Sequence, residues 1–270
     1  MHPFFLRLAK RLIRLVRYNS FMWSGDYPDW ASAMRRCTGY QADNILDRCR
    51  AALREVLAGR AAYERDSLLF NDDRYCWELM TVAYQTAARH QGRLSVLDFG
   101  GSLGSLYFQH RRWLADIPSV HWHVVEQPHF VDCGRAEAED KRLRFFHTIE
   151  ESVAASQPNV LLLSGVLQAL ERPYEWAEQF NRLGVPYIVL DRVAIDKDAQ
   201  RDVLTVQNVA PHIYSASYPS WFFNEAQFLG AFSNYRLLSA FQSQYDWNQW
   251  VNGRRCTWRG YVLIHRDHWP

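Results

Sequence analysis

A glycine-rich turn follows an apolar run near the middle of the chain. Residues 95–105 read Ser-Val-Leu-Asp-Phe-Gly-Gly-Ser-Leu-Gly-Ser, and a helical pattern begins at about Leu106. The run ends in an acid, Asp98, and the turn contains Gly100, Gly101 and Gly104. Glycine permits positive φ angles and a close approach of the backbone to a ligand, so the turn predicts a nucleotide-like ligand at the carboxyl end of a parallel strand. The alternative is a tight turn whose glycines serve packing alone.

A second carboxylate ends the next apolar run, Val124-Val125-Glu126. At that position it can accept hydrogen bonds from both hydroxyls of a ribose. The Gly-Gly-x-x-Gly spacing departs from the Gly-x-Gly-x-x-Gly of dinucleotide sites, and Asp98 would repel a pyrophosphate. An acid there suits a cationic cofactor. We therefore expect S-adenosylmethionine, which carries an amino group and a sulfonium.

The elements that position these residues follow the pattern of βαβ units. Short apolar runs alternate with amphipathic helical stretches from Leu94 onward, which predicts a parallel sheet. Two later runs are joined by a polar loop and predict an antiparallel hairpin at one sheet edge. The expected parallel strands are Leu94–Asp98, Val120–Glu126, Leu143–His147, Val160–Ser164 and Tyr187–Asp191, and the expected hairpin strands are Tyr235–Gln242 and Trp258–His265.

The region before the sheet predicts a helical cap. A loop-like aromatic segment over residues 21–40 precedes helices expected at about Ala42–Leu57 and Asp73–Arg89. We expect three parts: residues 1–20, a cap over 21–92, and a cofactor-binding domain over 93–270. Residues 4–17 place apolar side chains on one arc of a helix and basic ones on the other. This basic amphipathic helix predicts peripheral contact with an anionic membrane, or packing on its own domain or on a second subunit.

Composition and charge narrow the class of protein. The chain has 270 residues, of which 48% are hydrophobic, 15% aromatic and 22% charged, as in a globular protein with a sizeable core. The formal net charge is +2, and residues 1–20 contain five bases and no acid, so the rest of the chain is net acidic and no nucleic-acid partner is expected. The five cysteines form no C-x-x-C pair, no secretory signal is evident, and no apolar run is long enough to span a bilayer. These features predict a cytoplasmic protein, peripheral to the inner face of the membrane if residues 4–17 bind it.

Several segments together resemble a known family. They are Trp23-Ser24-Gly25-Asp26-Tyr27, Gly39-Tyr40, Tyr63-Glu64-Arg65-Asp66, Val96-Leu97-Asp98-Phe99-Gly100-Gly101, Trp122-His123-Val124-Val125-Glu126-Gln127, Ser164-Gly165-Val166-Leu167-Gln168, Leu190-Asp191-Arg192 and Ser217-Tyr218-Pro219-Ser220-Trp221-Phe222. The sequence resembles the class I S-adenosylmethionine-dependent methyltransferases, and more closely a bacterial family often encoded near surface-polysaccharide genes. The resemblance implies a Rossmann-like α/β fold, with a seven-stranded, mostly parallel sheet and a C-terminal antiparallel hairpin, preceded by the helical cap.

The same resemblance implies roles for individual residues. The turn at Gly100, Gly101 and Gly104 holds the methionine part of the cofactor, Asp98 lies near its amino group, and Glu126 binds its ribose. Residues after the third strand flank the adenine, although an aromatic pair there could equally belong to the core. Residues after the fourth strand line the slot where methyl donor meets acceptor. These further residues are Gln127, Phe146, His147, Ser164, Gly165 and Gln168.

Methyl transfer to a hydroxyl also needs a base above the strand ends. Asp191 ends the fifth expected strand and is the first candidate, with an ion pair to Arg192 as its alternative role. Tyr218 and His212 are the next candidates. The acids of residues 191–202 alternate with bases, as in a solvated loop, so no metal is expected.

The aromatic run over residues 213–223 predicts an acceptor-binding lid, or a hydrophobic lid packed on the N-terminal aromatic segment. The expected activity is methylation of an oxygen on a small-molecule or glycan acceptor, such as a glycan precursor. Two alternatives remain, a nicotinamide-dependent Rossmann oxidoreductase and a non-catalytic, membrane-associated module that retains the fold. The sequence leaves oligomerisation open.

Overall fold

The computed structural model describes residues 22–38, 43–209, 213, 216–243 and 249–268. The amphipathic stretch over residues 4–17, the Gly39-Tyr40 pair and His212 lie outside the described residues.

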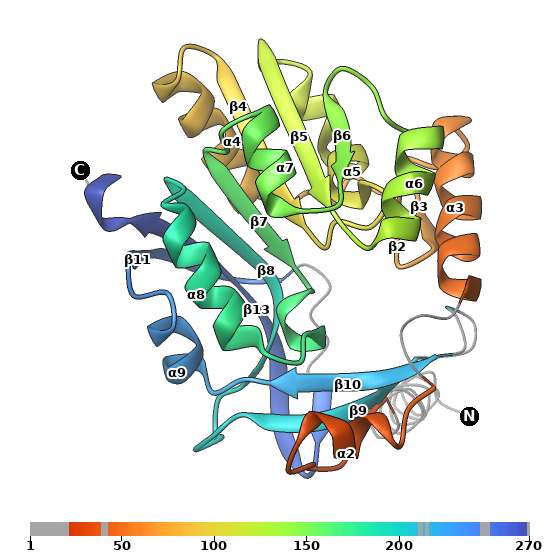
Figure 1. The fold of residues 1–270 in the computed structure, drawn as a ribbon, viewed down its shortest axis with the longest axis vertical. Coiled ribbons are helices and arrows are strands. Elements are labelled where there is room, and N and C mark those ends of the chain that lie inside the picture. Colours follow the sequence, from red (N-terminus) through yellow and green to blue (C-terminus); the bar gives the residue numbers. More distant parts are fainter. Residues whose placement is uncertain (1–21, 39–42, 210–212, 214–215, 244–248, 269–270) are drawn as a thin grey trace, which may run out of the picture.

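A large mixed sheet forms the centre of the molecule (Figure 1). Its strands follow the order β11-β13-β8-β7-β4-β5-β6, and β12 pairs with β13 outside this path. The strands from β6 to β8 run parallel, whereas β13 runs antiparallel to both β8 and β11. The expected Rossmann-like α/β fold, with a mostly parallel sheet and a C-terminal antiparallel hairpin, is thereby confirmed. The strands are β4 (Arg93–Phe99), β5 (Ser119–Val125), β6 (Leu143–Phe146), β7 (Val160–Ser164), β8 (Tyr187–Asp196), β11 (Tyr235–Gln242), β12 (Gln249–Val251) and β13 (Arg254–His265).

Both faces of the sheet are covered by helices. Successive side chains of a strand point to opposite faces, so that on β4 the buried Val96 packs on one face and the buried Leu97 on the other. In Figure 1, α7 and α8 cross in front of the sheet, whereas α4 and α5 lie behind it. Apolar runs buried on both faces explain why the parallel strands were visible in the sequence. The helices are α4 (Trp77–Arg89), α5 (Ser105–Leu114), α6 (Pro128–Glu137), α7 (Ile149–Ala155), α8 (Pro173–Leu183) and α9 (Glu225–Gly230).

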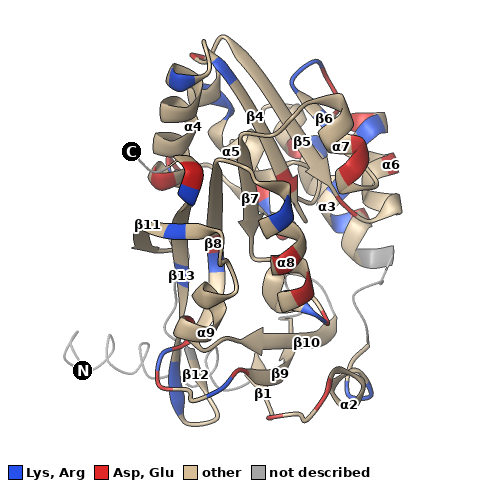
Figure 2. Cartoon of the chain, turned by 60° about the vertical axis from the view of Figure 1, so that its left-hand side comes forward, with Lys and Arg blue, Asp and Glu red and all other residues tan. Residues whose placement is uncertain are grey.

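Local sequence signals begin and end these helices. Thr148 precedes α7, and its hydroxyl accepts a hydrogen bond from the backbone of Glu151 at 3.1 Å. Proline opens α6 and α8, where its missing N–H costs nothing. Gly184 ends α8 in the left-handed conformation. In the cartoon of Figure 2, acidic positions are marked along α8 and basic ones near the start of β13. There Arg254 forms an ion pair with the buried Asp196 of β8 at 2.8 Å.

A second, smaller sheet was not expected. It consists of β1 (Trp23–Ser24), β9 (Val203–Asn208) and β10 (Ser217–Phe222), which pair antiparallel in the order β1-β9-β10. The helix α2 (Trp30–Met34) packs on it, with Trp30 stacked on Trp221 at 6.5 Å between ring centroids. Trp23 meets Phe222 edge-on at 6.0 Å.

This second sheet bears on two expectations, correcting the first and confirming one interpretation of the second. The aromatic segment over residues 21–40 contains a strand and a helix rather than loop alone. The run over residues 213–223 contains the strand β10, and its packing on the N-terminal aromatic segment, one of the two interpretations, is confirmed. Some of the aromatic rings of these two segments therefore pack between β1, α2 and β10.

The expected cap helices are present as α3 (Asp43–Leu57) and α4, with a hairpin between them. The hairpin strands are β2 (Tyr63–Arg65) and β3 (Leu68–Phe70), and Arg65 pairs with Leu68. The two-residue turn is Asp66-Ser67, with φ angles of 50° and 65°. Positive φ at both turn residues is typical of the tight hairpin turn that matches the twist of the strands. This turn brings Asp66 to the edge of the cavity described next.

Candidate functional site

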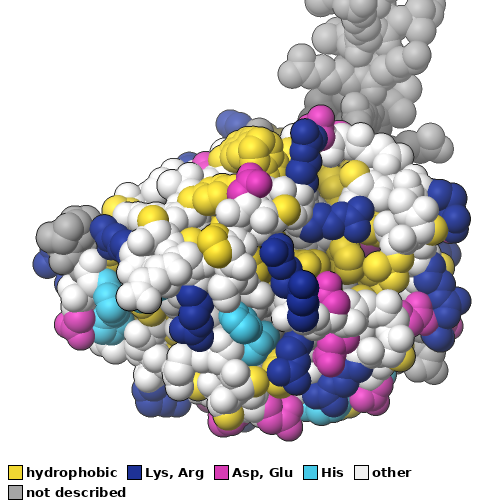
Figure 3. Space-filling model, turned by 90° about the horizontal axis from the view of Figure 1, so that it is seen from above, with side chains coloured by type: hydrophobic (Ala, Val, Ile, Leu, Met, Phe, Trp, Pro, Cys, Tyr) yellow, Lys and Arg dark blue, Asp and Glu magenta, His cyan; other side chains and the backbone are white. Residues whose placement is uncertain are grey.

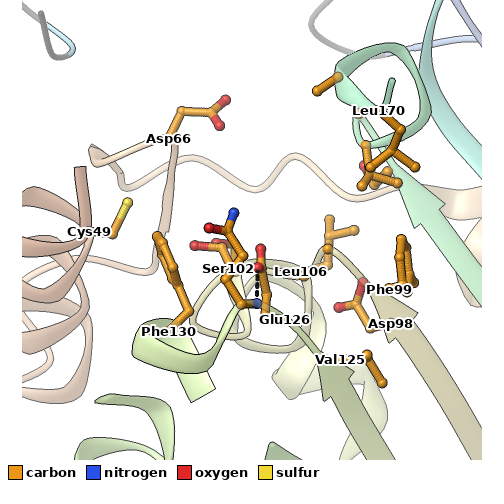
Figure 4. Close-up of a pocket in the computed structure, with 18 of the residues that line it drawn as sticks. Cys49, Asp66, Asp98, Phe99, Ser102, Leu106, Val125, Glu126, Phe130 and Leu170 are labelled. Carbon is orange, nitrogen blue, oxygen red and sulfur yellow. Dashed lines mark hydrogen bonds between the residues drawn. The ribbon is translucent and has the colours of Figure 1, made fainter. Parts of the chain in front are cut away.

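A cavity of about 460 Å³ opens at the carboxyl ends of β4, β5 and β7. This volume lies within the range of roughly 300–1,000 Å³ that is typical of small-molecule sites. Figure 4 shows Cys49 and Phe130 on one side of the cavity and Phe99 and Leu170 on the other, with Glu126 between them. The cavity therefore lies where open α/β sheets bind ligands.

Asp98 is the buried acid of this cavity, at 1% exposure. The indole Nε1 of Trp122, on the neighbouring strand β5, donates a hydrogen bond to Asp98 Oδ2 at 2.9 Å. A Cβ at Gly101 would lie 2.6 Å from the Asp98 carboxyl carbon, so the turn can pass over the acid only as glycine. Burial, with a smaller contribution from the charge of nearby Glu126, raises the pKa of Asp98 to about 7. A cation placed in the cavity would restore the charged form.

The three glycines of the turn have different roles. Gly100 and Gly101 line the cavity. Gly100 has a φ of +73°, and a Cβ there would lie 2.5 Å from a methyl group of Val166. Gly104, at φ +87°, precedes α5 and faces Leu143 in the core, away from the cavity lining. Its requirement is one of helix entry and packing.

Glu126 follows β5 and lines the cavity with its neighbour Gln127. The backbone N–H of Gln127 donates a hydrogen bond to Glu126 Oε2 at 2.7 Å, which fixes the carboxylate. Burial raises the pKa of Glu126 as well. On the same side Phe130 and, from α3, Ile45 provide apolar surface. A fixed acceptor beside an apolar wall is an arrangement that can bind a ribose and the flat ring attached to it.

The two residues expected to flank adenine are separated by the structure. His147 lines the cavity, and its Nε2 lies 3.2 Å from Nη1 of Arg135. Phe146 is buried in the core against His123, with ring centroids 4.6 Å apart, and is absent from the lining. Phe146 therefore belongs to the core. Phe130 lines the cavity instead, and sequence reasoning missed it.

The residues after β7 also divide into lining and support. Ser164 and Gly165 line the cavity. Gln168 lies in a short 3-10 turn (Leu167–Ala169), is 7% exposed and does not line the cavity. Its side-chain Nε2 donates a hydrogen bond to the backbone carbonyl of Arg192 at 3.1 Å.

Neither of the two described candidate bases is itself a lining residue. Asp191 is 5% exposed, and its carboxylate accepts hydrogen bonds from the hydroxyls of Ser164 at 3.0 Å and Ser243 at 2.9 Å. Tyr218 lies on β10 and packs against the core. Neither residue lines the cavity, and His212 lies outside the described residues. Their role as bases stays a prediction from the sequence.

Arg192 lines the cavity and was missed as a site residue. It sits in a β-bulge, where Asp191 and Arg192 together oppose Gly260 of β13. Its φ is +54°, a conformation that costs a non-glycine residue roughly 1–3 kcal/mol. Bulges next to active sites redirect a side chain, and here the bulge turns the guanidinium toward the cavity. The sequence signal was the Leu-Asp-Arg motif at a strand end, from which Asp191 and not Arg192 was predicted as the site residue.

Arg192 and Asp66 meet across the rim of the cavity. Arg192 Nη1 lies 3.1 Å from Asp66 Oδ2, and Arg192 Nε donates to the hydroxyl of Ser164 at 3.2 Å. The side chain of Asp66 is 53% exposed and that of Arg192 is 22% exposed. A pair with this exposure is worth about 0–1 kcal/mol, so it does not offset the backbone conformation of Arg192 by itself.

Two further searches concern the described residues alone. Among them no group of three or more His, Cys, Asp or Glu side chains is arranged to hold a metal ion. The helices in the same part of the chain are all too short or too polar to cross a membrane.

Comparison with known proteins gave structural matches only. No family model and no curated protein matches the chain. Matching solved structures include the N-terminal domain of EvdMO1 in the presence of SAH and D-fucose, at 14% identity and a TM-score of 0.46 over 84% of this chain and 100% of that one. Another is an S-adenosylmethionine-dependent methyltransferase from Clostridium acetobutylicum ATCC 824, at 8% identity and a TM-score of 0.44 over 80% and 97% of the two chains. A third is SAM-bound CalS10, an amino pentose methyltransferase from Micromonospora echinaspora, at 13% identity and a TM-score of 0.41 over 70% and 90%.

All three matches are at low sequence identity.

Proposed function

We propose that this protein is an S-adenosylmethionine-dependent methyltransferase. The observation that carries the proposal is the placement of two carboxylates in one cavity, Asp98 beside a glycine turn at the end of β4 and Glu126 at the end of β5. A pyrophosphate at the turn would meet the charge of Asp98, whereas an amino group would be attracted by it. The pair therefore favours a cationic nucleoside over a dinucleotide.

The residues present fit this cofactor. Asp98 is positioned by Trp122 to accept from an ammonium, and the glycines at 100 and 101 leave room for backbone contact with the methionine part. Glu126 is fixed by Gln127 to accept from ribose hydroxyls. Phe130 and Ile45 offer apolar surface for the adenine.

When bound, S-adenosylmethionine supplies a methyl group that its sulfonium already activates. The protein's contribution is then to align the acceptor and to exclude water. The side of the cavity opposite Glu126 can receive the acceptor, because Ser164, Leu170 and Arg192 line it there. The acceptor that we propose is a hydroxyl of a glycan or glycan precursor, supported by the family resemblance and by apolar lining such as Phe99 and Trp176.

The first test compares two ligands on the melting temperature. S-adenosylhomocysteine, at a large excess over its Kd, is expected to raise the melting temperature by several degrees, because a ligand at 100 times its Kd stabilises the folded state by about 2.7 kcal/mol. NADH at the same concentration is expected to leave it unchanged. If NADH alone raises the melting temperature, the cavity is assigned to a nicotinamide cofactor. If neither ligand changes the melting temperature, the result supports a non-catalytic module.

A further inference from the structure

Four residues at or near the strand ends combine to hold the Arg192 guanidinium at the rim of the cavity. The hydroxyl of Ser164 donates to the buried Asp191 and accepts from Nε of Arg192, which orients the hydroxyl and the guanidinium together. A Cβ at Gly165 would lie 3.1–3.3 Å from the Arg192 guanidinium, so the glycine makes room for it. Gln168 holds the carbonyl of Arg192 through its amide. The Ser-Gly-x-x-Gln and Asp-Arg motifs thus serve one side chain.

This guanidinium lies on the acceptor side of the proposed cofactor. The sheet order is β8-β7-β4-β5, so Arg192 on β8 is two strands from Asp98 on β4 and three from Glu126 on β5. Neighbouring strands are about 4.8 Å apart, which puts the strand of Arg192 roughly 10 Å from the strand of Asp98. Ser164 and Gly165, after β7, lie between the two. The backbone of Arg192 thus lies two strands from that of Asp98, although its positive charge still acts to lower the pKa of that acid.

We propose that Arg192 binds an anionic group of the methyl acceptor, either a phosphate or a carboxylate. The inference rests on the proposed methyltransferase function. Arginine binds both groups through paired N–H donors. A carboxylate, that of Asp66, already lies 3.1 Å from Arg192 Nη1 and shows that this position suits an anion.

Asp66 occupies the guanidinium until the acceptor replaces it. It sits at the tip of the β2–β3 turn with its side chain 53% exposed, so its carboxylate can turn to solvent without leaving a buried charge. The pair joins the cap to the sheet domain across the mouth of the cavity, and Figure 4 shows Asp66 above the acids of its floor. When an anionic acceptor enters, Arg192 exchanges the Asp66 carboxylate for the acceptor's anionic group, so little electrostatic energy is lost.

The test is calorimetric titration of the full chain, saturated with S-adenosylhomocysteine, with three sugars. Glucose 1-phosphate carries a phosphate, glucuronate carries a carboxylate and glucose carries neither. At least one anionic sugar is expected to bind at least tenfold more tightly than glucose, and the one preferred identifies the anionic group. Equal binding of glucose, or no binding of either anionic sugar, overturns the proposal.

Variants assign the effect to Arg192. Arg192→Gln is expected to weaken anionic-sugar binding at least tenfold and to leave S-adenosylhomocysteine affinity within twofold. Asp66→Asn is expected to strengthen anionic-sugar binding severalfold, since the competing carboxylate is removed. The matched control is Arg201→Gln, which breaks the surface pair of Arg201 with Asp26 and should change neither affinity.

The outcomes separate this inference from the proposed function. If the wild type binds no S-adenosylhomocysteine, the proposed function fails. If it binds S-adenosylhomocysteine but Arg192→Gln retains full affinity for the anionic sugar, only the inference fails. Loss of S-adenosylhomocysteine binding by a folded Arg192→Gln protein would also overturn it, because Arg192 would then serve the cofactor.

Discussion

At the scale of single residues, Asp98 is an acid placed where its charge is disfavoured. It is 1% exposed, and its single described hydrogen-bond donor is the indole of Trp122. Burial raises its pKa to about 7, far above the ordinary value for an aspartate. An acid in this environment is suited to a ligand that brings its own positive charge.

The affinity for S-adenosylhomocysteine should therefore depend on pH. Below pH 7 the unliganded protein holds a proton on Asp98, and that proton must leave before the carboxylate can pair with the ligand's amino group. Affinity is expected to rise by up to about tenfold per pH unit toward pH 7 and then to level off. Burial also raises the pKa of Glu126, so protonation of Glu126 adds to the loss of S-adenosylhomocysteine affinity at low pH.

Titration calorimetry across this pH range, in two buffers of different ionisation enthalpy, measures both affinity and proton release. Asp98→Asn keeps an oxygen for the Trp122 hydrogen bond but has no proton to release. It is expected to bind more weakly and with a shallower pH dependence. A wild-type affinity that stays constant through pH 6 and 7 would contradict the role of Asp98.

At the scale of elements, the bulge between β8 and β13 depends on Gly260. This glycine pairs with Phe241 of the edge strand β11, and a Cβ on it would lie 2.1 Å from the Phe241 ring. The aromatic ring thus covers a glycine across the strand pair. On the other side of β13, Gly260 lies opposite the bulge of β8 that directs Arg192 toward the cavity.

Gly260→Ala is expected to lower the free energy of unfolding by about 1–3 kcal/mol, because the new methyl group overlaps the ring. Phe241→Leu in the same chain should recover part of the loss, and a denaturant titration of both single variants and the double variant measures it. Gly230→Ala is the control, since nothing lies within 4 Å of a Cβ there. Strictly additive losses would show that the ring and Gly260 are not coupled.

The sequence predicted the central elements closely because their apolar runs are continuous. The strand Val160–Ser164 was predicted with its observed ends. The strand beginning at Tyr187 continues to Asp196, past the predicted end at Asp191. The bulge interrupts its alternation with a polar pair, and a register change of one residue moves side chains to the other face.

The site was predictable where one residue type implies one function. Asp98 and Glu126 end strands as acids, and both line the cavity. Asp66 was not predicted as a lining residue because its place depends on a hairpin whose strands have three residues each. The second sheet was missed for a similar reason, since β1 has two residues and pairs with β9 from the far end of the chain.

At the scale of the whole molecule, charge divides along the sequence. Residues 1–20 carry five bases, and the rest of the chain is net acidic. Figure 3 shows basic, acidic and apolar side chains interspersed on the described face at the N-terminal ends of the parallel strands. Such mixed surfaces are typical of solvated protein. We call residues 1–20 the leader. Its concentration of positive charge is a property of the sequence, because residues 1–20 lie outside the described residues.

We expect the leader to bring the protein to anionic membranes. In liposome flotation the full chain should move with vesicles that contain phosphatidylserine and stay behind with neutral vesicles, because each base near an anionic surface contributes about 1 kcal/mol. Deletion of residues 1–18 should abolish flotation without changing the affinity for S-adenosylhomocysteine. A full-length protein that remains in the soluble fraction with anionic vesicles would contradict this expectation.

Titration calorimetry with S-adenosylhomocysteine tests most directly whether the cavity at the carboxyl ends of β4, β5 and β7 binds S-adenosylmethionine. The wild type is expected to bind one equivalent. Glu126→Gln should bind about 10–100-fold more weakly, because a hydrogen bond to a charged group is worth about 1.5–3 kcal/mol. Glu178→Ala, on the exposed side of α8, should bind like the wild type. The absence of binding by the wild type, or equal binding by Glu126→Gln, would contradict the account.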